Sequence, residues 1–93
     1  MRTIEWTGQF KRDYRRESKG QHRATLDSDI FSVIDLLAND SPLEIRRRDH
    51  QLTGEWKDHR DCHIKPDLVL IYQKPDLGTL RLVRVGSHSE LGL

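Results

Sequence analysis

The sequence is short of several features that would assign its class at once. Cys62 is the only cysteine, so no disulfide can form within the chain. A single thiol fits a reducing compartment, and we expect a cytoplasmic protein. The first residues carry no leader-like apolar run, and no stretch reaches the roughly 18–20 apolar residues of a helical membrane span. We therefore expect no contact with a membrane.

An excess of one charge is also missing. Sixteen lysines and arginines face 15 aspartates and glutamates, and the formal net charge of +1 selects no partner. The basic residues are nevertheless gathered in two segments: Lys11, Arg12, Arg15, Arg16, Lys19 and Arg23 in the first, and Arg46, Arg47 and Arg48 in the second. Such clusters suit phosphate groups, although two solvated surfaces would give the same pattern.

The length of 93 residues allows one core, so we expect a single domain over residues 1–93. Hydrophobic periodicity predicts helices over residues 8–19 and 26–38, and strands over 3–6, 56–64, 68–72 and 80–85. Short turns between the last three strands predict an antiparallel meander. The order β-α-α-β-β-β predicts an α+β fold, with a small, mostly antiparallel sheet and two N-terminal helices packed on one face.

The stretch HRDCHIKPD, residues 59–67, concentrates polar chemistry. His59, Cys62 and His63 could begin a zinc site. Side chains on a strand alternate between faces, however, so Asp61 would share a face with the two histidines while Cys62 points the other way. Paired cysteine motifs are absent as well. We therefore expect no metal and no other cofactor, and interpret Cys62 as a packing residue.

The same stretch also suits acid–base chemistry. Histidines beside carboxylates can transfer protons near neutral pH, and an arginine can hold a phosphate by a fork of donors. These residue types lie around the predicted sheet as follows: His50 before the second strand, Asp61 and His63 on it, Asp67 in the next turn, and Arg84 and His88 near the end. If the second and fourth strands lie near the centre of the sheet, these groups could converge for metal-free RNA cleavage. Idle surface histidines and a turn-forming aspartate would leave the same pattern.

Three stretches of the sequence together resemble the YafQ branch of the RelE-like toxins from bacterial type II toxin–antitoxin systems. They are DHQLTGEWKDHRDCHIKPDLVLIYQ at residues 49–73, RLVRVGSHSEL at 81–91, and the opening IEWTGQFKRDYRR at 4–16. The spaced histidine and aspartate set is the specific part of this resemblance, which covers nearly the whole chain and implies a RelE-like fold.

The resemblance implies an endoribonuclease, an mRNA interferase that cuts the codon in the ribosomal A site. The reaction would be metal-independent attack of the 2′-oxygen on the adjacent phosphate, and close relatives prefer adenine-rich codons. The family's catalytic residues fall here on His50, Asp61, His63, Asp67 and His88. His88 would be the general acid, Asp61 would orient a histidine, and His50, His63 and Asp67 are candidates for the base and for orienting the ribose. Arg84 would bind the phosphate.

The resemblance also implies partners. Both basic clusters would contact ribosomal RNA, through Lys11, Arg12, Arg15, Arg16, Lys19, Arg46, Arg47 and Arg48. A cognate antitoxin of the ribbon-helix-helix type would wrap the toxin in a heterotetramer or similar complex, and would link it to operator DNA.

Two positions depart from the family pattern. Gly92 stands where relatives commonly carry an aromatic ring, and His59 stands where a relative may carry tyrosine. Loss of the ring leaves open a second interpretation, a catalytically weakened domain that only binds an antitoxin or the ribosome. A third interpretation, a metal-dependent nuclease using His59, Cys62 and His63, also stays open on sequence alone.

Overall fold

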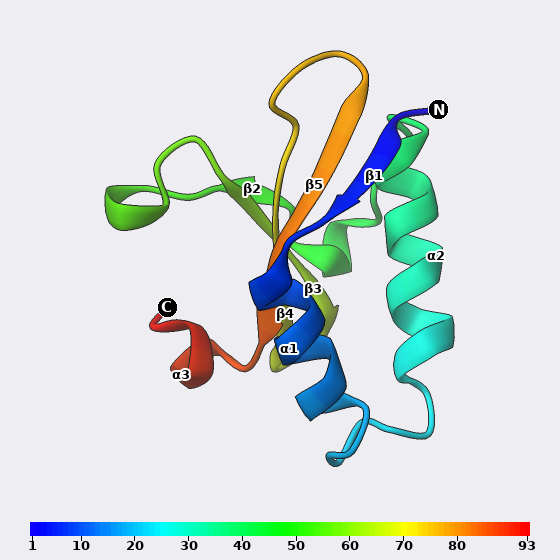
Figure 1. The fold of residues 1–93 in the computed structure, drawn as a ribbon, viewed down its shortest axis with the longest axis vertical. Helices are drawn as coiled ribbons and strands as arrows, with labels where there is room; N and C mark the ends of the chain where they lie inside the picture. The colour runs from blue at the N-terminus through cyan, green and yellow to red at the C-terminus, as the bar shows by residue number, and fades with distance from the viewer.

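The sheet has five strands in the order β1-β5-β4-β3-β2 in the computed structural model, which describes residues 1–93 (Figure 1). Neighbouring strands are antiparallel except for β1 and β5, which are parallel. The strands are β1 (Thr3–Trp6), β2 (His50–Gln51), β3 (Arg60–Lys65), β4 (Leu68–Gln73) and β5 (Thr79–Gly86). The predicted α+β class and the antiparallel meander of the last three long strands are confirmed.

The main core lies between this sheet and α2 (Leu26–Ala38), which stands along one face (Figure 1). The five apolar residues whose spacing predicts the inner face of this helix are all buried: Leu26, Ile30, Val33, Ile34 and Leu37. Leu68 to Tyr72 of β4 are buried on both faces, as expected for a central strand. Val69 and Ile71 lie on the face opposite α2, where they form a smaller cluster with Leu91.

Helix α1 (Gly8–Glu17) packs along the part of β5 that does not pair with β1. Thr7 caps it, because its hydroxyl accepts a hydrogen bond from the Phe10 amide at 3.1 Å. Strand β1 pairs only with Thr79–Leu82, and α1 runs beside the remainder of β5. Thr7 Oγ1 donates to the Val83 carbonyl at 3.0 Å, so the first turn of α1 satisfies part of the strand edge that β1 leaves open.

Most predicted boundaries agree within two residues, but one region is wrong. Residues 56–59 are not strand: a 3₁₀ turn occupies Gly54–Trp56, and β3 begins only at Arg60. The short strand β2, a second 3₁₀ turn at Ile45–Arg47 and the four-residue helix α3 (His88–Leu91) were not predicted. Elements of two to four residues are too short to show hydrophobic periodicity. Among the helices, none has the length and apolar character needed to cross a membrane.

Candidate active site

Two histidines from distant parts of the sequence meet beside an arginine-lined cleft. His63 lies on β3 and His88 opens α3, and their ring centroids are 5.1 Å apart at an interplanar angle of 67°. The adjacent cleft has a volume of about 590 Å³ and is lined by Arg46, Arg47, Arg48, His63, Ile64, Lys65, Pro66 and His88. Strands β3 and β5 lie on either side of β4 in the sheet. His63 on β3 and His88, which follows β5, are therefore close together.

Asp67 orients His88. One carboxylate oxygen, Oδ1, accepts hydrogen bonds from the His88 amide at 3.1 Å and from His88 Nδ1 at 2.7 Å. These bonds hold the pKa of Asp67 below its ordinary value. Because Nδ1 is engaged, the proton that His88 can exchange with a substrate is the one on Nε2.

The environment of His63 favours its neutral form. Burial lowers the pKa of His63, and the neighbouring His88 lowers it further; Asp61 opposes them with a smaller effect, and Arg48 adds a still smaller decrease. A neutral imidazole at neutral pH can accept a proton. His63 therefore has the character of a base, and His88, held by a carboxylate, lies beside it.

Asp61 lies close to His50, His63 and His88, and only 3% of its surface is exposed. Burial raises the pKa of this carboxyl, and the nearby His50 and His63 moderate the rise. His50 faces Asp61 across the β2–β3 pair, and its Nδ1 is 3.1 Å from Asp61 Oδ1. His50 Nδ1 nevertheless donates to the Arg48 carbonyl at 2.7 Å, so Asp61 Oδ1 has no hydrogen-bond donor within the protein.

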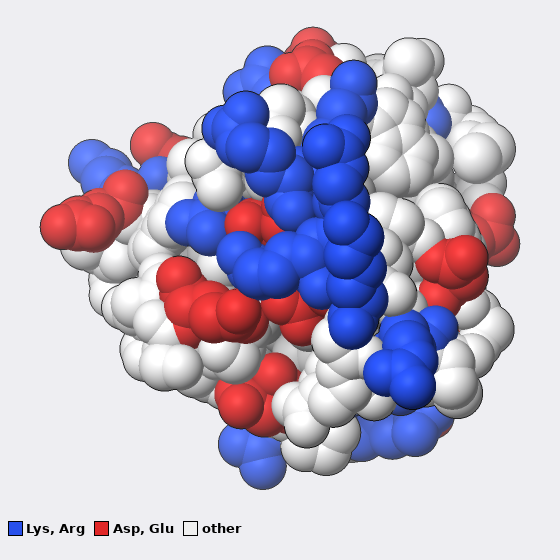
Figure 2. Space-filling view, turned by 60° about the horizontal axis from the view of Figure 1, so that its bottom comes forward, with Lys and Arg blue, Asp and Glu red and all other residues white.

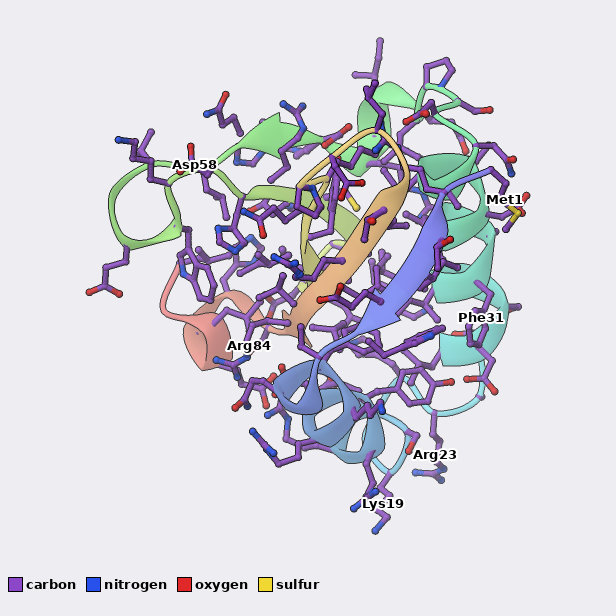
Figure 3. All side chains as sticks on the ribbon, turned by 45° about the horizontal axis from the view of Figure 1, so that its top comes forward. Met1, Lys19, Arg23, Phe31, Asp58 and Arg84 are labelled. Carbon is purple, nitrogen blue, oxygen red and sulfur yellow. The ribbon has the colours of Figure 1, made fainter.

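Arg84 does not stand free at the cleft. Its Nε and Nη2 donate to the two oxygens of Asp13 at 2.7 and 3.1 Å, which leaves Nη1 without a partner (Figure 3 labels Arg84 beside α1). Asp13 is fully buried and also accepts the Val85 amide at 3.2 Å. Sequence reasoning missed Asp13. The available signal was an acidic residue three positions after Phe10, on the apolar side of α1.

The arginine triplet has divided uses. Arg47 donates to the carbonyls of His63 and Ile64 at 3.4 and 2.6 Å, where the β3–β4 register shifts. It thereby fixes the strand that carries His63. Arg46 is exposed and pairs only with Glu44, while Arg48 adopts a left-handed conformation with φ of 50° and lines the cleft. Two of the three guanidinium groups are thus available to an anionic partner.

The basic side chains of α1 and of the loop after it form a band on the end of the molecule opposite the β4–β5 loop (Figure 2). Lys19 and Arg23 project from this end into solvent (Figure 3). Arg16 differs from the others because its guanidinium contacts Asp13, Glu17 and Glu90. Lys11, Arg12, Arg15 and Lys19 remain exposed on this face.

The structure does not assemble the set His59, Cys62 and His63. Cys62 is completely buried in the main core, where burial raises the pKa of its thiol, so its predicted packing role is confirmed. His59 precedes β3, and its ring lies 5.4 Å from that of Trp56, edge to face. Over residues 1–93, no group of three or more histidine, cysteine, aspartate or glutamate side chains is arranged to hold a metal ion.

The departure at Gly92 has a conformational counterpart. Gly92 ends α3 with a φ of 72°, in the left-handed region that favours glycine. Leu91 before it packs on Val69 and Ile71, while Leu93 after it is 42% exposed. The tail therefore presents an aliphatic side chain to solvent at this end of the site.

The structure thus combines a five-stranded α+β domain, two adjacent histidines, a carboxylate bonded to one of them and an arginine-lined cleft, which is the class of small α+β protein with a polar, basic cleft. Comparison with known families makes the assignment specific. Residues 2–92 match the family described as bacterial toxin of type II toxin-antitoxin system, YafQ, and the chain belongs to this family.

Relatives with names or structures agree with this assignment. The mRNA interferase toxin YafQ of Escherichia coli K12 is 37% identical over 91 residues, covering 98% of this chain and 96% of its own. A copper-bound mutant toxin from Helicobacter pylori is 36% identical with a TM-score of 0.84, covering 98% and 99% of the two chains. The toxin in an E. coli DinJ-YafQ complex is 34% identical with a TM-score of 0.79, covering 98% of each.

Proposed function

We propose that this chain is an endoribonuclease that cleaves mRNA in the ribosomal A site and thereby inhibits translation. The observation that carries the proposal is the pair of imidazoles, His63 and His88, whose centroids are 5.1 Å apart at the edge of an arginine-lined cleft. One of them is kept neutral by its surroundings and the other is held by a carboxylate. Such a pair supplies one base and one acid for transfer of a phosphoryl group.

The reaction begins with removal of the 2′-hydroxyl proton by His63. The 2′-oxygen then forms a bond to the adjacent phosphorus, and the bond from phosphorus to the 5′-oxygen breaks. His88 Nε2 gives a proton to that leaving oxygen, so the products are a 2′,3′-cyclic phosphate and a 5′-hydroxyl. Arg48, which lines the cleft, supplies positive charge for the pentavalent phosphorane. Arg84 would contribute only through its Nη1, because its Nε and Nη2 hold Asp13.

The remaining members of the set act around this pair. Asp67 orients His88 through hydrogen bonds, whereas Asp61 acts on His50 and His63 only through its charge. His50 has Nδ1 committed to the Arg48 carbonyl, so its Nε2 can accept a hydrogen bond from the ribose.

Reconstituted translation of a defined mRNA, with 5′ ends mapped by primer extension, tests this mechanism. We expect cuts within codons that persist with a zinc-selective chelator and fall by about 10²-fold or more in His88→Ala. His59→Gln is the matched histidine control, since His59 contacts Trp56 outside the cleft. Ribosome binding without cuts would favour the binding-only alternative, and loss of cutting on chelation would favour a metal-dependent one.

The exposed basic residues give docking on ribosomal RNA. Neutralising Lys11, Arg12, Arg15 or Arg46 removes one phosphate contact, and each change reduces the slope of log affinity against log salt by about one. The affinity of purified ribosomes for each variant, measured between low and physiological salt, tests this assignment.

The antitoxin partner would cover the aromatic groove beside the basic band. Each of the aromatic rings of Trp6, Phe10, Tyr14 and Phe31 contacts two of the others. Trp6 and Phe31 are 38% and 45% exposed. Lys11 and Arg15 line the same hollow of about 410 Å³. An amphipathic antitoxin helix with an apolar face and an acidic flank fits this surface.

Titration of the chain with the antitoxin encoded beside its gene tests the groove. We expect Phe31→Ser to weaken binding by about tenfold or more, as for a partly exposed aromatic anchor. Leu77→Ser, an equally apolar and 93% exposed position on the β4–β5 loop, is the control. Equal affinity of both variants would place the antitoxin elsewhere.

A further inference from the structure

Arg16 contacts four residues outside the histidine cluster, namely Asp13, Glu17, Val85 and Glu90. Its Nη1 donates to Asp13 at 3.1 Å and its Nη2 to the Val85 carbonyl at 3.1 Å. Its Nε lies 3.0 Å from Glu90 and 2.9 Å from Glu17. The guanidinium thus joins α1, the end of β5 and α3, which is a different use from the solvent-facing role expected of a basic residue in this segment.

One side of Arg16 is anchored in the interior. Asp13 is fully buried and fixed by Arg84 and by the Val85 amide. Burial alone would raise the pKa of Asp13, but these hydrogen bonds outweigh it and hold the pKa below its ordinary value. Arg16 therefore reaches outward from a carboxylate that stays charged and immobile.

The other side of Arg16 holds the cap of α3. Glu90 presents one oxygen to Arg16 and the other to the Ser87 amide at 2.8 Å, while Ser87 Oγ accepts the Glu90 amide at 3.1 Å. This capping box fixes the first turn of a helix of only four residues, which cannot be stable by itself. The first residue of that helix is His88.

Gly86 provides the space that Arg16 needs. A Cβ at position 86 would lie 2.9 Å from Arg16 Nη2 and 3.2 Å from a Glu90 carboxylate oxygen. A side chain at position 86 would therefore crowd the guanidinium and the Glu90 carboxylate, and these groups would have to move away from the end of β5. Gly86, Arg16 and Glu90 form one packed unit at the start of α3.

We propose that Arg16 is a positioning residue, which holds the Glu90–Ser87 cap and so keeps His88 against Asp67. The catalytic part of this inference rests on the proposed function, because it treats His88 as the general acid. The structural part does not, since the contact between His88 and Asp67 exists in the free protein.

Three glutamine variants separate positioning from electrostatic docking. Arg15→Gln and Arg16→Gln remove the same charge from the same helix, but only Arg16 contacts Glu90. Glu90→Gln breaks the same contact from its other end while changing the charge in the opposite direction. The measurement is single-turnover mRNA cleavage over a range of ribosome concentrations, with the maximal rate and the half-saturating concentration fitted separately.

We expect Arg15→Gln to raise the half-saturating concentration alone. Arg16→Gln and Glu90→Gln should both lower the maximal rate by about tenfold or more, since a misplaced catalytic group is costly. Their half-saturating concentrations should move in opposite directions. A maximal rate unchanged in Glu90→Gln, or an Arg16→Gln profile that matches Arg15→Gln, would overturn the proposal.

A carbon-detected NMR titration of Asp67 provides a readout independent of cleavage. In Arg16→Gln we expect the pKa of Asp67 to rise toward its ordinary value, because the hydrogen bonds from His88 that lower it are loosened. A wild-type chain that cuts no mRNA would refute the proposed function while this titration still decides the positioning role. An unchanged Asp67 titration in a folded Arg16→Gln variant would refute that role.

Discussion

Replacement of Asp13 by asparagine should lower the free energy of unfolding more than any other polar substitution on α1. Asp13 is fully buried and accepts hydrogen bonds from Arg16, Arg84 and Val85. Removing one partner of a buried ion pair costs about 3–5 kcal/mol, because the other charge is left uncompensated. Arg84 keeps 22% of its side chain in contact with solvent, which places the expected loss near the lower limit, at about 3 kcal/mol.

That loss is large for a domain of this size. A chain of 93 residues has a free energy of unfolding of roughly 5–14 kcal/mol, at about 0.05–0.15 kcal/mol per residue. The midpoint of thermal unfolding should fall by roughly 12 °C or more, at about 4–8 °C per kcal/mol. Urea denaturation at pH 7, followed by tryptophan fluorescence and circular dichroism, gives the free energy directly.

The pH dependence gives the effect a signature. The pKa of Asp13 is lower in the folded chain than in the unfolded one, so its stabilising contribution is present at neutral pH and is lost as the pH falls below about 4. The difference between wild type and Asp13→Asn should therefore shrink in acid. Asp40→Asn, which removes an exposed carboxylate paired with Arg2 and Lys74, is the control and should have a much smaller effect. A loss below about 1 kcal/mol at pH 7, or one that does not change with pH, would refute the reasoning.

Three further outcomes are expected. In His88→Asn the pKa of His63, followed by NMR, should rise because a neighbouring imidazole no longer opposes its charge; an unchanged value would mean that the two rings are not coupled. Arg47→Gln should lower the free energy of unfolding by about 1–3 kcal/mol, since charged donors to two strand carbonyls are lost, whereas Arg46→Gln should leave it unchanged; equal effects in urea titrations would contradict the division of the triplet. Cys62 should resist thiol reagents until the chain unfolds, and rapid labelling of the native protein would show that it is not buried.

The sequence predicted a helix or strand correctly where the same hydrophobic periodicity continued over several helical turns or several strand residues. The inner face of α2 and the doubly buried β4 are of this kind, and both are as expected. Residues 56–59 were predicted as strand because they continue the polar alternation of β3, yet Asp58 has a φ of 72° and turns the chain before the strand begins. A left-handed aspartate carries no pattern that distinguishes it from a strand residue.

The sequence could predict which residue types lie near the cleft, but it could not predict their contacts. Alternation along β3 correctly placed Asp61 and His63 on one face and Cys62 on the other. The bond between His88 and Asp67 depends on a four-residue helix and its cap, and the engagement of Arg84 depends on a buried acid 71 positions earlier in the chain. Interactions across such separations are set by tertiary packing, so local sequence patterns do not reveal them.

The pairing of β1 with β5 has a consequence for when the candidate site can form during synthesis. The first strand and the helix after it bind residues 79–86, and His88 follows directly. During synthesis, these partners leave the ribosome long after the N-terminal segment that binds them. Until residues 79–88 have emerged, a nascent chain lacks the strand edge on which α1 packs and the histidine at the cleft. The candidate site can therefore form only after the ribosome has made nearly all of the domain.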